Sequence, residues 1–317
     1  GDFEKLIKVL SPTVLVLGKE HEYERDVQVR AAVKLQEKQG GEIFFHAGET
    51  RYASADLLKD NLTELHELQT HQFKQACNQQ KIKLDELQEC IDKFKDTSLL
   101  VIGDSIVDQY VACEALGMSA EAPIVVVREL DTRDYAGGAA LVAMHVSALG
   151  ADCRYISVVG QDTTATIVEN DLERLNVQHV LVEDNSRPTT FKIRYLVNSQ
   201  KLFRVSRMKE HGLSQKVEEK IIKELKDAAP KIQGIIVSDF VYGVITPRIL
   251  KTISELSAKH QLLVFGDLQC SSQIGNVSKF KNFELLCPTE REARIAIGTQ
   301  DEGVEWGANT LMSQTNS

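Results

Sequence analysis

The stretch DYAGGAALVAMHVSALGA, residues 134–151, joins a pair of glycines to a pattern typical of a helix. Gly137 and Gly138 permit a sharp turn and let another backbone or a ligand come close. The helix predicted after them offers free N–H groups at its N-terminus to a polar or anionic group. The same glycines could also serve only the packing of a tight strand-to-helix turn. The surrounding sequence has to separate these two interpretations.

Strand and helix patterns alternate from residue 98 onward. Hydrophobic segments of strand length include SLLVIG at 98–103, GIIVS at 234–238 and LLVFG at 262–266, and helical patterns lie between them. This alternation predicts an α/β fold with a doubly wound, mostly parallel sheet. Two strand-like segments, near 108–128 and 187–207, depart from that rhythm and predict a small antiparallel β flap.

The first 97 residues divide into two parts of different character. Residues 1–58 alternate helix and strand, with a buried strand expected in TVLVLGK at 13–19, and too few strands for a comfortable domain. We interpret them as the C-terminal part of a larger α/β domain. Residues 59–97 contain neither glycine nor proline and predict a helical linker of one or two helices.

Composition narrows the class of protein. The chain carries 46 acidic and 37 basic residues, a net charge of −9, which argues against a nucleic-acid partner. No apolar run approaches the roughly 18 residues of a membrane span. The cysteines and histidines show no metal-ligand spacing, so reduced thiols in a cytoplasmic protein are the expectation.

Three strands predicted to be parallel end in an acid, at Asp104, Asp239 and Asp267. Ligands of open α/β sheets bind beyond the carboxyl ends of the strands, where carboxylates can accept hydrogen bonds from sugar hydroxyls. Each acid could instead cap the helix that follows it. Three such acids together with the glycine pair favour a pocket for a sugar or polyol.

Several segments, in order, resemble the ribokinase (PfkB) family of sugar kinases. The resemblance covers about residues 98–297 and is carried by IGDSIVDQY (102–110), SAEAPIVVV (119–127), the stretch at 134–151 and YISVVGQD (155–162). Three further segments are similar to the heptose-7-phosphate kinase branch, as SAEAPIVVV is: RPTTFKIRYLVNSQKLFRVSR (187–207), SDFVYGVIT (238–246) and LLCPTEREA (285–293). That branch pairs a kinase with a cytidylyl- or adenylyltransferase domain.

The resemblance implies an ATP- and Mg²⁺-dependent kinase that phosphorylates a sugar or sugar phosphate. Asp104 would hold sugar hydroxyls, and the backbone at Gly137 and Gly138 would approach the sugar. Asp239 and Asp267 would line the cleft. A nucleotide-activated sugar would be the product of the complete bifunctional protein.

Cations and one further acid complete the implied site. Lys192, Arg194 and Arg204 lie on the flap strands, where they could meet a substrate phosphate, although solvated strand charges are the alternative. Glu292 matches the acid that lies near Mg²⁺ and the nucleotide phosphates. A homodimer through the flap strands or the helical linker is also expected.

The chain departs from the family pattern at several positions. Leu141 and Thr289 stand where the family has Asn, Tyr242 stands where it has Lys, and DLQC occupies 267–270. These changes question heptose phosphate as the substrate. The Gly-Ala-Gly-Asp motif that supplies the catalytic base is not found before Ser317, so we expect this chain to bind a sugar better than it phosphorylates one.

Residues 3–58 are similar to the C-terminal end of the nucleotidyltransferase domain of that bifunctional family. Ser54 matches a hydroxyl position there, and the HxGH motif of that fold is absent from this sequence. Two other functions stay open. The chain could be a catalytically incomplete sugar-binding or scaffold module, or an interaction protein built around the helices at 57–97.

Overall fold

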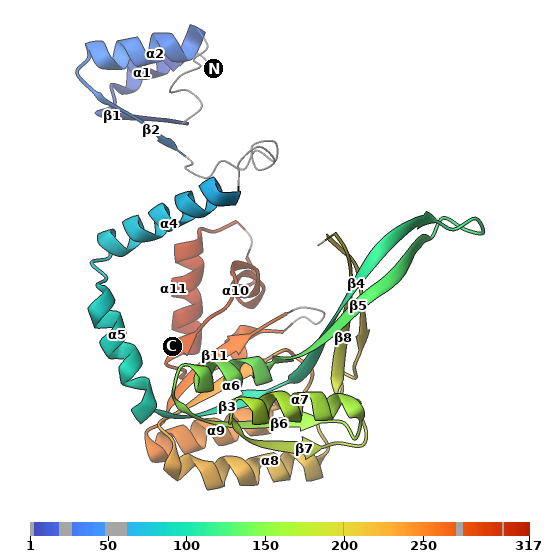
Figure 1. Ribbon diagram of the computed structural model, residues 1–317. Coiled ribbons are helices and arrows are strands. Elements are labelled where there is room, and N and C mark those ends of the chain that lie inside the picture. Colours follow the sequence, from blue (N-terminus) through green and yellow to red (C-terminus); the bar gives the residue numbers. More distant parts are fainter. Residues whose placement is uncertain (1–2, 19–26, 48–61, 199, 271–274, 300) are drawn as a thin grey trace. The chain divides into compact units, whose positions relative to one another are not determined.

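The computed structural model describes residues 3–18, 27–47, 62–198, 200–270, 275–299 and 301–317. The chain divides into two compact units, Gly1–Lys83 and Leu84–Ser317 (Figure 1). Within the described ranges, no helix combines the length and the apolar character needed to cross a bilayer. Ser54 lies outside the described residues.

The first unit contains helices and one pair of parallel strands. Its elements are α1 (Phe3–Leu10), β1 (Val14–Gly18), α2 (Val27–Lys38), β2 (Glu42–Ala47) and α4 (Leu62–Gln79). Strands β1 and β2 pair in parallel, with Leu15 opposite Ile43 and Val16 opposite Phe44. The core between the helices includes the buried residues Ile7, Val29, Ala32 and Val33.

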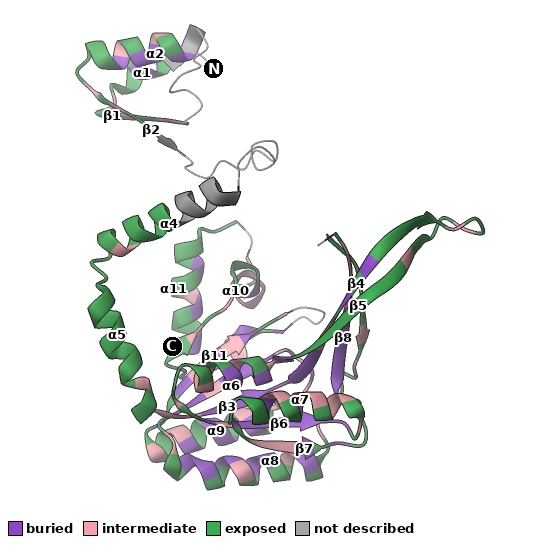
Figure 2. Ribbon diagram, in the orientation of Figure 1, coloured by how far each residue is buried: buried purple, intermediate pink, exposed green. Residues whose placement is uncertain are grey.

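The expectation of a buried strand at 13–19 is wrong. Val14 and Val16 of β1 are 45% and 54% exposed, and Phe44 of β2 is 44% exposed (Figure 2). Leu15 and Ile43, which point to the other face of the pair, are half-buried. Helix α2 contacts β2 on one side of the two-stranded sheet, and the other face of the sheet is exposed.

The described part of the linker, residues 62–97, does not form one continuous helix. Helix α4 ends at Gln79, and Lys81 follows in the left-handed region with φ of 56°. Helix α5 (Leu84–Asp92) begins three residues later and has no buried residue, and the 3₁₀ turn η2 (Phe94–Asp96) leads into the second unit. A residue in the left-handed region just after the last helical turn is a common end of a helix. This segment is therefore two helices joined by a turn.

The second unit is built on a six-stranded parallel sheet, as the alternation predicts. The strand order is β12-β11-β10-β3-β6-β7. Its strands are β3 (Ser98–Gly103), β6 (Asp152–Val159), β7 (Gln178–Glu183), β10 (Gly234–Asp239), β11 (Leu263–Leu268) and β12 (Leu285–Leu286). Sheet order and crossovers of this kind bring the carboxyl ends of β3, β10 and β11 to one edge.

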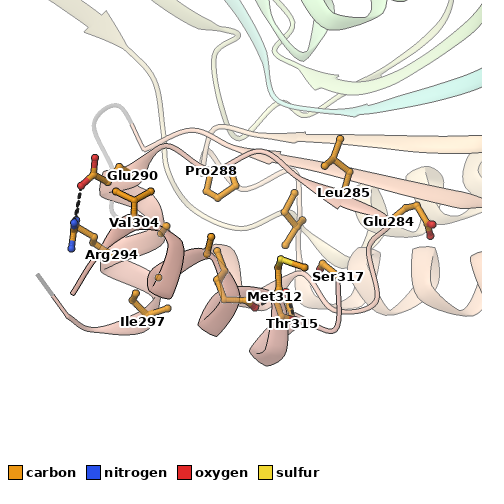
Figure 3. A pocket seen from close by; sticks show the side chains of 16 residues that line it. Glu284, Leu285, Pro288, Glu290, Arg294, Ile297, Val304, Met312, Thr315 and Ser317 are labelled. Atoms are coloured by element: carbon orange, nitrogen blue, oxygen red, sulfur yellow. Dashed lines mark hydrogen bonds and ion pairs between the residues drawn. The ribbon is translucent and has the colours of Figure 1, made fainter. Parts of the chain in front are cut away.

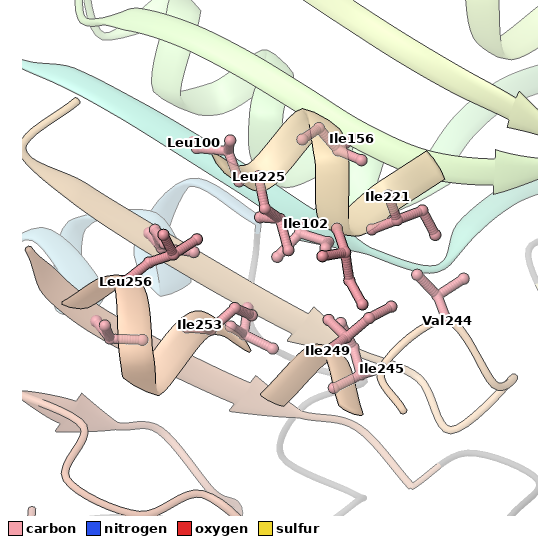
Figure 4. Close-up of a cluster of buried hydrophobic side chains, with 14 of the residues drawn as sticks. Leu100, Ile102, Ile156, Ile221, Leu225, Val244, Ile245, Ile249, Ile253 and Leu256 are labelled. Carbon is pink, nitrogen blue, oxygen red and sulfur yellow. The ribbon is translucent and has the colours of Figure 1, made fainter. Parts of the chain in front are cut away.

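Helices cover both faces of this sheet, and each face has its own core. On one face lie α8 (Gln215–Ala228) and α9 (Pro247–His260), which pack on Leu100 and Ile102 of β3 (Figure 4). On the other face lie α6 (Ala139–Ala148) and α7 (Thr163–Arg174), whose core includes Val101. Alternate residues of one strand thus enter opposite cores. The remaining elements are η3 (Ala229–Lys231), η4 (Val277–Lys279), α10 (Glu290–Ile297) and α11 (Val304–Thr315).

The flap is a four-stranded sheet with the order β5-β4-β8-β9. Its strands are β4 (Ser105–Met118), β5 (Val125–Gly138), β8 (Thr190–Val197) and β9 (Gln200–Arg207). The β4–β5 and β8–β9 pairs are antiparallel, but β4 and β8 pair in parallel, so the expectation of an antiparallel flap is wrong at that pair. The reason is that β4 and β8 continue the chain from the carboxyl ends of the parallel strands β3 and β7 (Figure 1).

Candidate functional site

The flap has an apolar face and a polar face. Buried apolar side chains of β4 and β8 enter the core beside α6 and α7: Val107, Val111, Phe191 and Ile193. Side chains alternate along a strand, so the neighbours of these residues lie on the opposite face. The strand register places Asp108 beside Lys192, Tyr110 beside Arg194, and Arg194 opposite Arg204 of β9. We call these five residues the polar face of the flap.

Arg194 is anchored on this face. Its guanidinium forms an ion pair with Asp108 and lies 5.3 Å from the centroid of the Tyr110 ring. The Arg194 side chain is 18% exposed, which does not fit the alternative of an ordinary solvated strand charge. Arg204 on the neighbouring strand is exposed. Two guanidinium groups on adjacent strands suit an anion with several oxygens.

Lys192 is buried, with 3% of its surface exposed. Its Nζ lies 4.9 Å from the ring centroid of Tyr242 and 5.6 Å from that of Phe240. Both rings belong to the loop after β10, so this lysine joins the flap to the edge of the parallel sheet. A buried ammonium over two aromatic faces is a cation–π arrangement, not a solvated charge. Tyr242, where the family has Lys, is thus one of the rings that contact Lys192.

Asp104 follows β3 and is buried beneath the loop after β10. Its Oδ2 accepts hydrogen bonds from the backbone N–H groups of Phe240 (2.8 Å) and Tyr242 (3.3 Å), and its Oδ1 accepts one from Val244 (3.2 Å). Burial raises the pKa of Asp104 to about 6, the nearby Asp239 adds to the rise, and these hydrogen bonds oppose it. A carboxylate accepts about four hydrogen bonds, so Asp104 retains little capacity for a sugar hydroxyl.

Asp239, at the end of β10, binds the same loop after β10 as Asp104 does. Its Oδ1 accepts a hydrogen bond from the Val241 N–H at 2.8 Å, and its Oδ2 forms an ion pair with Lys279. Val241 has φ of 64°, which is a strained conformation for a β-branched residue. The two carboxylates and the loop therefore restrain one another, as strained backbone requires.

The glycine pair at the start of α6 is explained by close packing. A Cβ atom on Gly138 would lie 2.4 Å from the carbonyl oxygen of Asp104, and φ of 62° at this residue also favours glycine. A Cβ atom on Gly137 would lie 2.5 Å from Oδ2 of Asp108. The backbone N–H of Ala139 donates to the Asp104 carbonyl at 3.0 Å. The glycines thus bring the start of α6 against Asp104 and Asp108, while the approach of a sugar to them stays a prediction.

Asp267 and Glu292 form a second group, at the end of β11. Burial raises the pKa of Asp267, and the negative charge of Glu292 adds to this, against a hydrogen bond from Gln269. Glu292 is buried: its Oε1 accepts the Cys270 N–H at 2.7 Å, and its Oε2 accepts the Thr289 N–H at 2.8 Å. Thr289 in turn caps α10, so the two residues form a capping box.

Two positions where the family has Asn and this chain does not, Thr289 and Leu141, have different surroundings in the structure. Thr289, in place of Asn, performs the N-cap role that Asn also performs well. Leu141 lies on α6 and is 43% exposed, and its burial does not explain the substitution. Sequence reasoning missed Asp108 and Tyr110, although their two-residue spacing within β4 indicates a shared face.

The C-terminal part of the chain forms a mainly apolar pocket. It has a volume of about 380 Å³ and lies between β12, α10 and α11, with Leu285, Pro288, Ile297 and Val304 among its lining (Figure 3). None of the acids, cations or glycines predicted for the site lines it. A sugar needs hydrogen-bonding groups, which this pocket offers sparsely. The candidate site is therefore the region between the polar face of the flap and the loop after β10.

The sequence is similar to those of known, curated proteins. Bifunctional protein HldE of Proteus mirabilis (strain HI4320) is 31% identical over 221 residues, which are 69% of this chain and 45% of that protein. Bifunctional protein HldE of Geobacter sulfurreducens is 32% identical over 200 residues, which are 63% of this chain and 40% of that protein. The chain thus spans less than half the length of these curated relatives.

Solved structures share the fold at low sequence identity. Phosphofructokinase-2 from Escherichia coli in complex with substrates and products aligns with a TM-score of 0.55 and 16% identity, covering 69% of this chain and 70% of that one. Ribokinase from Giardia lamblia aligns with a TM-score of 0.54 and 15% identity, covering 70% of this chain and 71% of that one. A family model described as pfkB family carbohydrate kinase matches residues 96–315. This chain belongs to the pfkB family of carbohydrate kinases.

Proposed function

We propose that this chain binds a sugar phosphate against the polar face of the flap and takes part in its phosphorylation by ATP with Mg²⁺. The observation that carries the proposal is the register of the flap. It aligns the cations Lys192, Arg194 and Arg204 on one face with Asp108 among them. Arg and Lys side chains bind phosphate through charge-assisted hydrogen bonds, and a carboxylate beside them can accept sugar hydroxyls.

Heptose phosphate is the substrate that we favour. The resemblance of 187–207 to the heptose-7-phosphate kinase branch supports it, and so does the similarity to the proteins named HldE. In this proposal Arg194 and Arg204 meet the substrate phosphate and Asp108 accepts hydroxyl hydrogen bonds, while Asp104 holds the loop 240–244 in place beside them. Leu141 and Tyr242 would then adjust which heptose fits.

Asp267 and Glu292 would face the magnesium and the phosphates of the nucleotide. Within the described residues there is no cluster of three or more His, Cys, Asp or Glu side chains that could hold a metal by itself. Mg²⁺ in kinases is bound by one or two carboxylates together with the substrate phosphates, so these two acids fit that mode. Their fit rests on their place at the end of β11, where Asp267 lies and where Glu292 accepts the Cys270 N–H, because a cation there would offset the repulsion between the two carboxylates. When bound, the metal neutralises charge on the phosphates.

Calorimetry with a heptose 7-phosphate and with the unphosphorylated heptose tests the proposal. We expect the wild-type chain to bind the phosphorylated sugar more tightly, and Arg204→Met to remove most of the difference. Lys216→Met, at an exposed position on α8, is the matched control. Binding of neither sugar would contradict the proposal.

An assay of ADP release by the complete protein then separates the kinase from a catalytically incomplete sugar-binding module. Turnover of ATP that depends on the sugar phosphate supports the kinase. Tight binding without turnover by the complete protein at saturating ATP and Mg²⁺ supports a sugar-binding module instead. The two assays together therefore distinguish the proposed enzyme from its alternative, because each function predicts a different pair of results.

We further propose a homodimer formed through the flap. The ribbon of β4 and β5 carries large apolar side chains that are more than half exposed: Leu116, Met118, Ile124, Val125 and Leu130. Exposed apolar patches of this kind mark interaction surfaces. Light scattering on the wild-type chain and on Leu130→Lys tests this, with a dimer expected only for the former. A monomeric wild-type chain at tens of micromolar would contradict it.

The first unit fits a nucleotidyltransferase-like origin. Its parallel β1–β2 pair is crossed by α2 and leaves Val16 and Phe44 exposed on one face. We propose that in the complete protein residues 1–58 belong to such a domain and that residues 59–97 link them to the kinase. Nucleotide transfer by the complete protein, lost on removal of the first unit but with sugar binding retained, is the test.

A further inference from the structure

We propose that Arg187 is a positioning residue for sugar binding, which acts through the backbone of the loop 240–244. The inference rests on the proposed function, because it concerns the same site. Arg187 precedes β8 and is buried, with 8% of its surface exposed. It does not belong to the polar face of the flap.

The guanidinium of Arg187 joins three separate segments of the chain. Its Nε donates to Oδ2 of Asp184 at 2.9 Å, and its Nη1 donates to the carbonyl oxygen of Tyr242 at 2.9 Å. Its Nη2 donates to the carbonyl oxygens of His211 and Gly212. A planar guanidinium suits this task because its donors point in fixed directions, which a lysine cannot reproduce.

The loop 240–244 is held by acidic side chains, which bind its backbone N–H groups, and by Arg187, which binds a backbone carbonyl group. Its N–H groups at 240, 242 and 244 donate to Asp104, whereas the Tyr242 carbonyl accepts from Arg187. Gly243 has φ of 99°, and a Cβ atom there would lie 2.6 Å from the His211 carbonyl oxygen, so the loop also packs on that segment. Removal of Arg187 would leave the carboxylates of Asp104 and Asp239 to restrain a strained backbone.

The loop 240–244 supplies the two aromatic rings that contact Lys192, so its position determines where these rings lie. The rings of Phe240 and Tyr242 lie at 5.6 and 4.9 Å from its Nζ. A displaced Tyr242 backbone would move that ring and with it the cation on the polar face of the flap. Arg187 thus influences sugar-phosphate binding without a contact to the ligand.

Hydrogen exchange and calorimetry on Arg187→Met and Arg187→Lys test the inference. For Arg187→Met we expect exchange of the amides at 240–244 to accelerate at least tenfold and the dissociation constant for heptose 7-phosphate to rise at least tenfold. Arg187→Lys should rescue part of both effects, and it replaces Arg187→Met where that variant does not fold. Arg248→Met, which removes an ion pair with Glu218 on the α8–α9 side, is the control and should change neither quantity.

Two outcomes overturn the inference. One is unchanged exchange at 240–244 in both variants, and the other is a uniform acceleration that includes the amides of α9, since that would be a general loss of stability. Should the wild-type chain bind no sugar phosphate, the proposed function fails. The exchange rates would then still decide whether Arg187 positions the loop.

Discussion

Gly137 lies so close to Asp108 that a Cβ atom on the glycine would sit 2.5 Å from Oδ2 of the carboxylate. Asp108 in turn forms the ion pair that anchors Arg194. The glycine pair that opens α6 is therefore coupled to the polar face of the flap through one carboxylate. Both features come from segments that are far apart in the sequence.

Gly137→Ala should weaken sugar-phosphate binding more than it weakens the fold. The added methyl group displaces the Asp108 carboxylate and disturbs its ion pair with Arg194. We expect the dissociation constant for heptose 7-phosphate to rise at least tenfold in calorimetry. Gly303→Ala is the control, because a Cβ atom there meets nothing within 4 Å. Equal affinity of both variants would show that Asp108 does not bind or orient the ligand.

Lys192→Met should reduce binding of the phosphorylated sugar selectively. The methionine keeps the apolar stem against Phe240 and Tyr242 but removes the ammonium. We expect at least a tenfold loss for heptose 7-phosphate and a smaller loss for the unphosphorylated heptose. Lys201→Met, at an exposed position on β9, should leave both affinities unchanged. An equal loss for both sugars would place Lys192 at the hydroxyls instead of the phosphate.

The stability of the second unit should depend on the protonation of Asp104. The pKa of Asp104 is raised from 3.8 to about 6 in the folded protein, so between these values the folded state binds more protons than the unfolded state. The contribution of this group to the free energy of unfolding therefore falls as pH rises from 4 to 6, by up to about 3 kcal/mol. Asp104→Asn should lose this pH dependence.

Urea unfolding at pH 4, 5, 6 and 7 measures this difference between wild type and variant. Asp227→Asn, at an exposed position on α8, is the control and should follow the wild-type pH profile through this range. Parallel profiles for the wild type and Asp104→Asn would mean that Asp104 ionises normally despite its burial.

Thr289→Ala should destabilise α10, whereas Thr289→Asn should be tolerated. Thr289 caps the helix and donates to Glu292 at 2.8 Å, and Asn is an equally good N-cap. We expect Thr289→Ala to lower the free energy of unfolding by about 1 kcal/mol in urea titrations. Thr163→Ala, at an exposed position on α7, is the control. A loss for Thr289→Asn as large as for Thr289→Ala would contradict the capping role.

Much of the second unit could be predicted because its signals are local. Continuous apolar segments predict the buried strands β3, β10 and β11, and acids directly after them predict Asp104, Asp239 and Asp267 at one edge. The spacing of residues within one strand also places Lys192 and Arg194 on the same face. These features need only the alternation of side chains and the direction of parallel strands.

The sequence could not reveal contacts that depend on register between distant segments. Asp108 and Arg194 are 86 residues apart, and Arg187 and Tyr242 are 55 residues apart. The parallel pairing of β4 with β8 and the exposed face of β1 were also missed. A strand pattern indicates that successive side chains point to opposite faces of a sheet. It does not indicate which strand lies beside it or what covers each face.

By itself, therefore, the sequence determined the α/β class, the strand ends that carry acids and the cations of the flap. The tertiary structure alone decided that Asp104 and Asp239 bind backbone N–H groups of the loop after β10 and that Lys192 lies against aromatic rings. The physical reason is that periodicity is encoded locally. The partner of a buried charge is selected only when strands, loops and helices pack together, because an unpaired charge is costly in the interior.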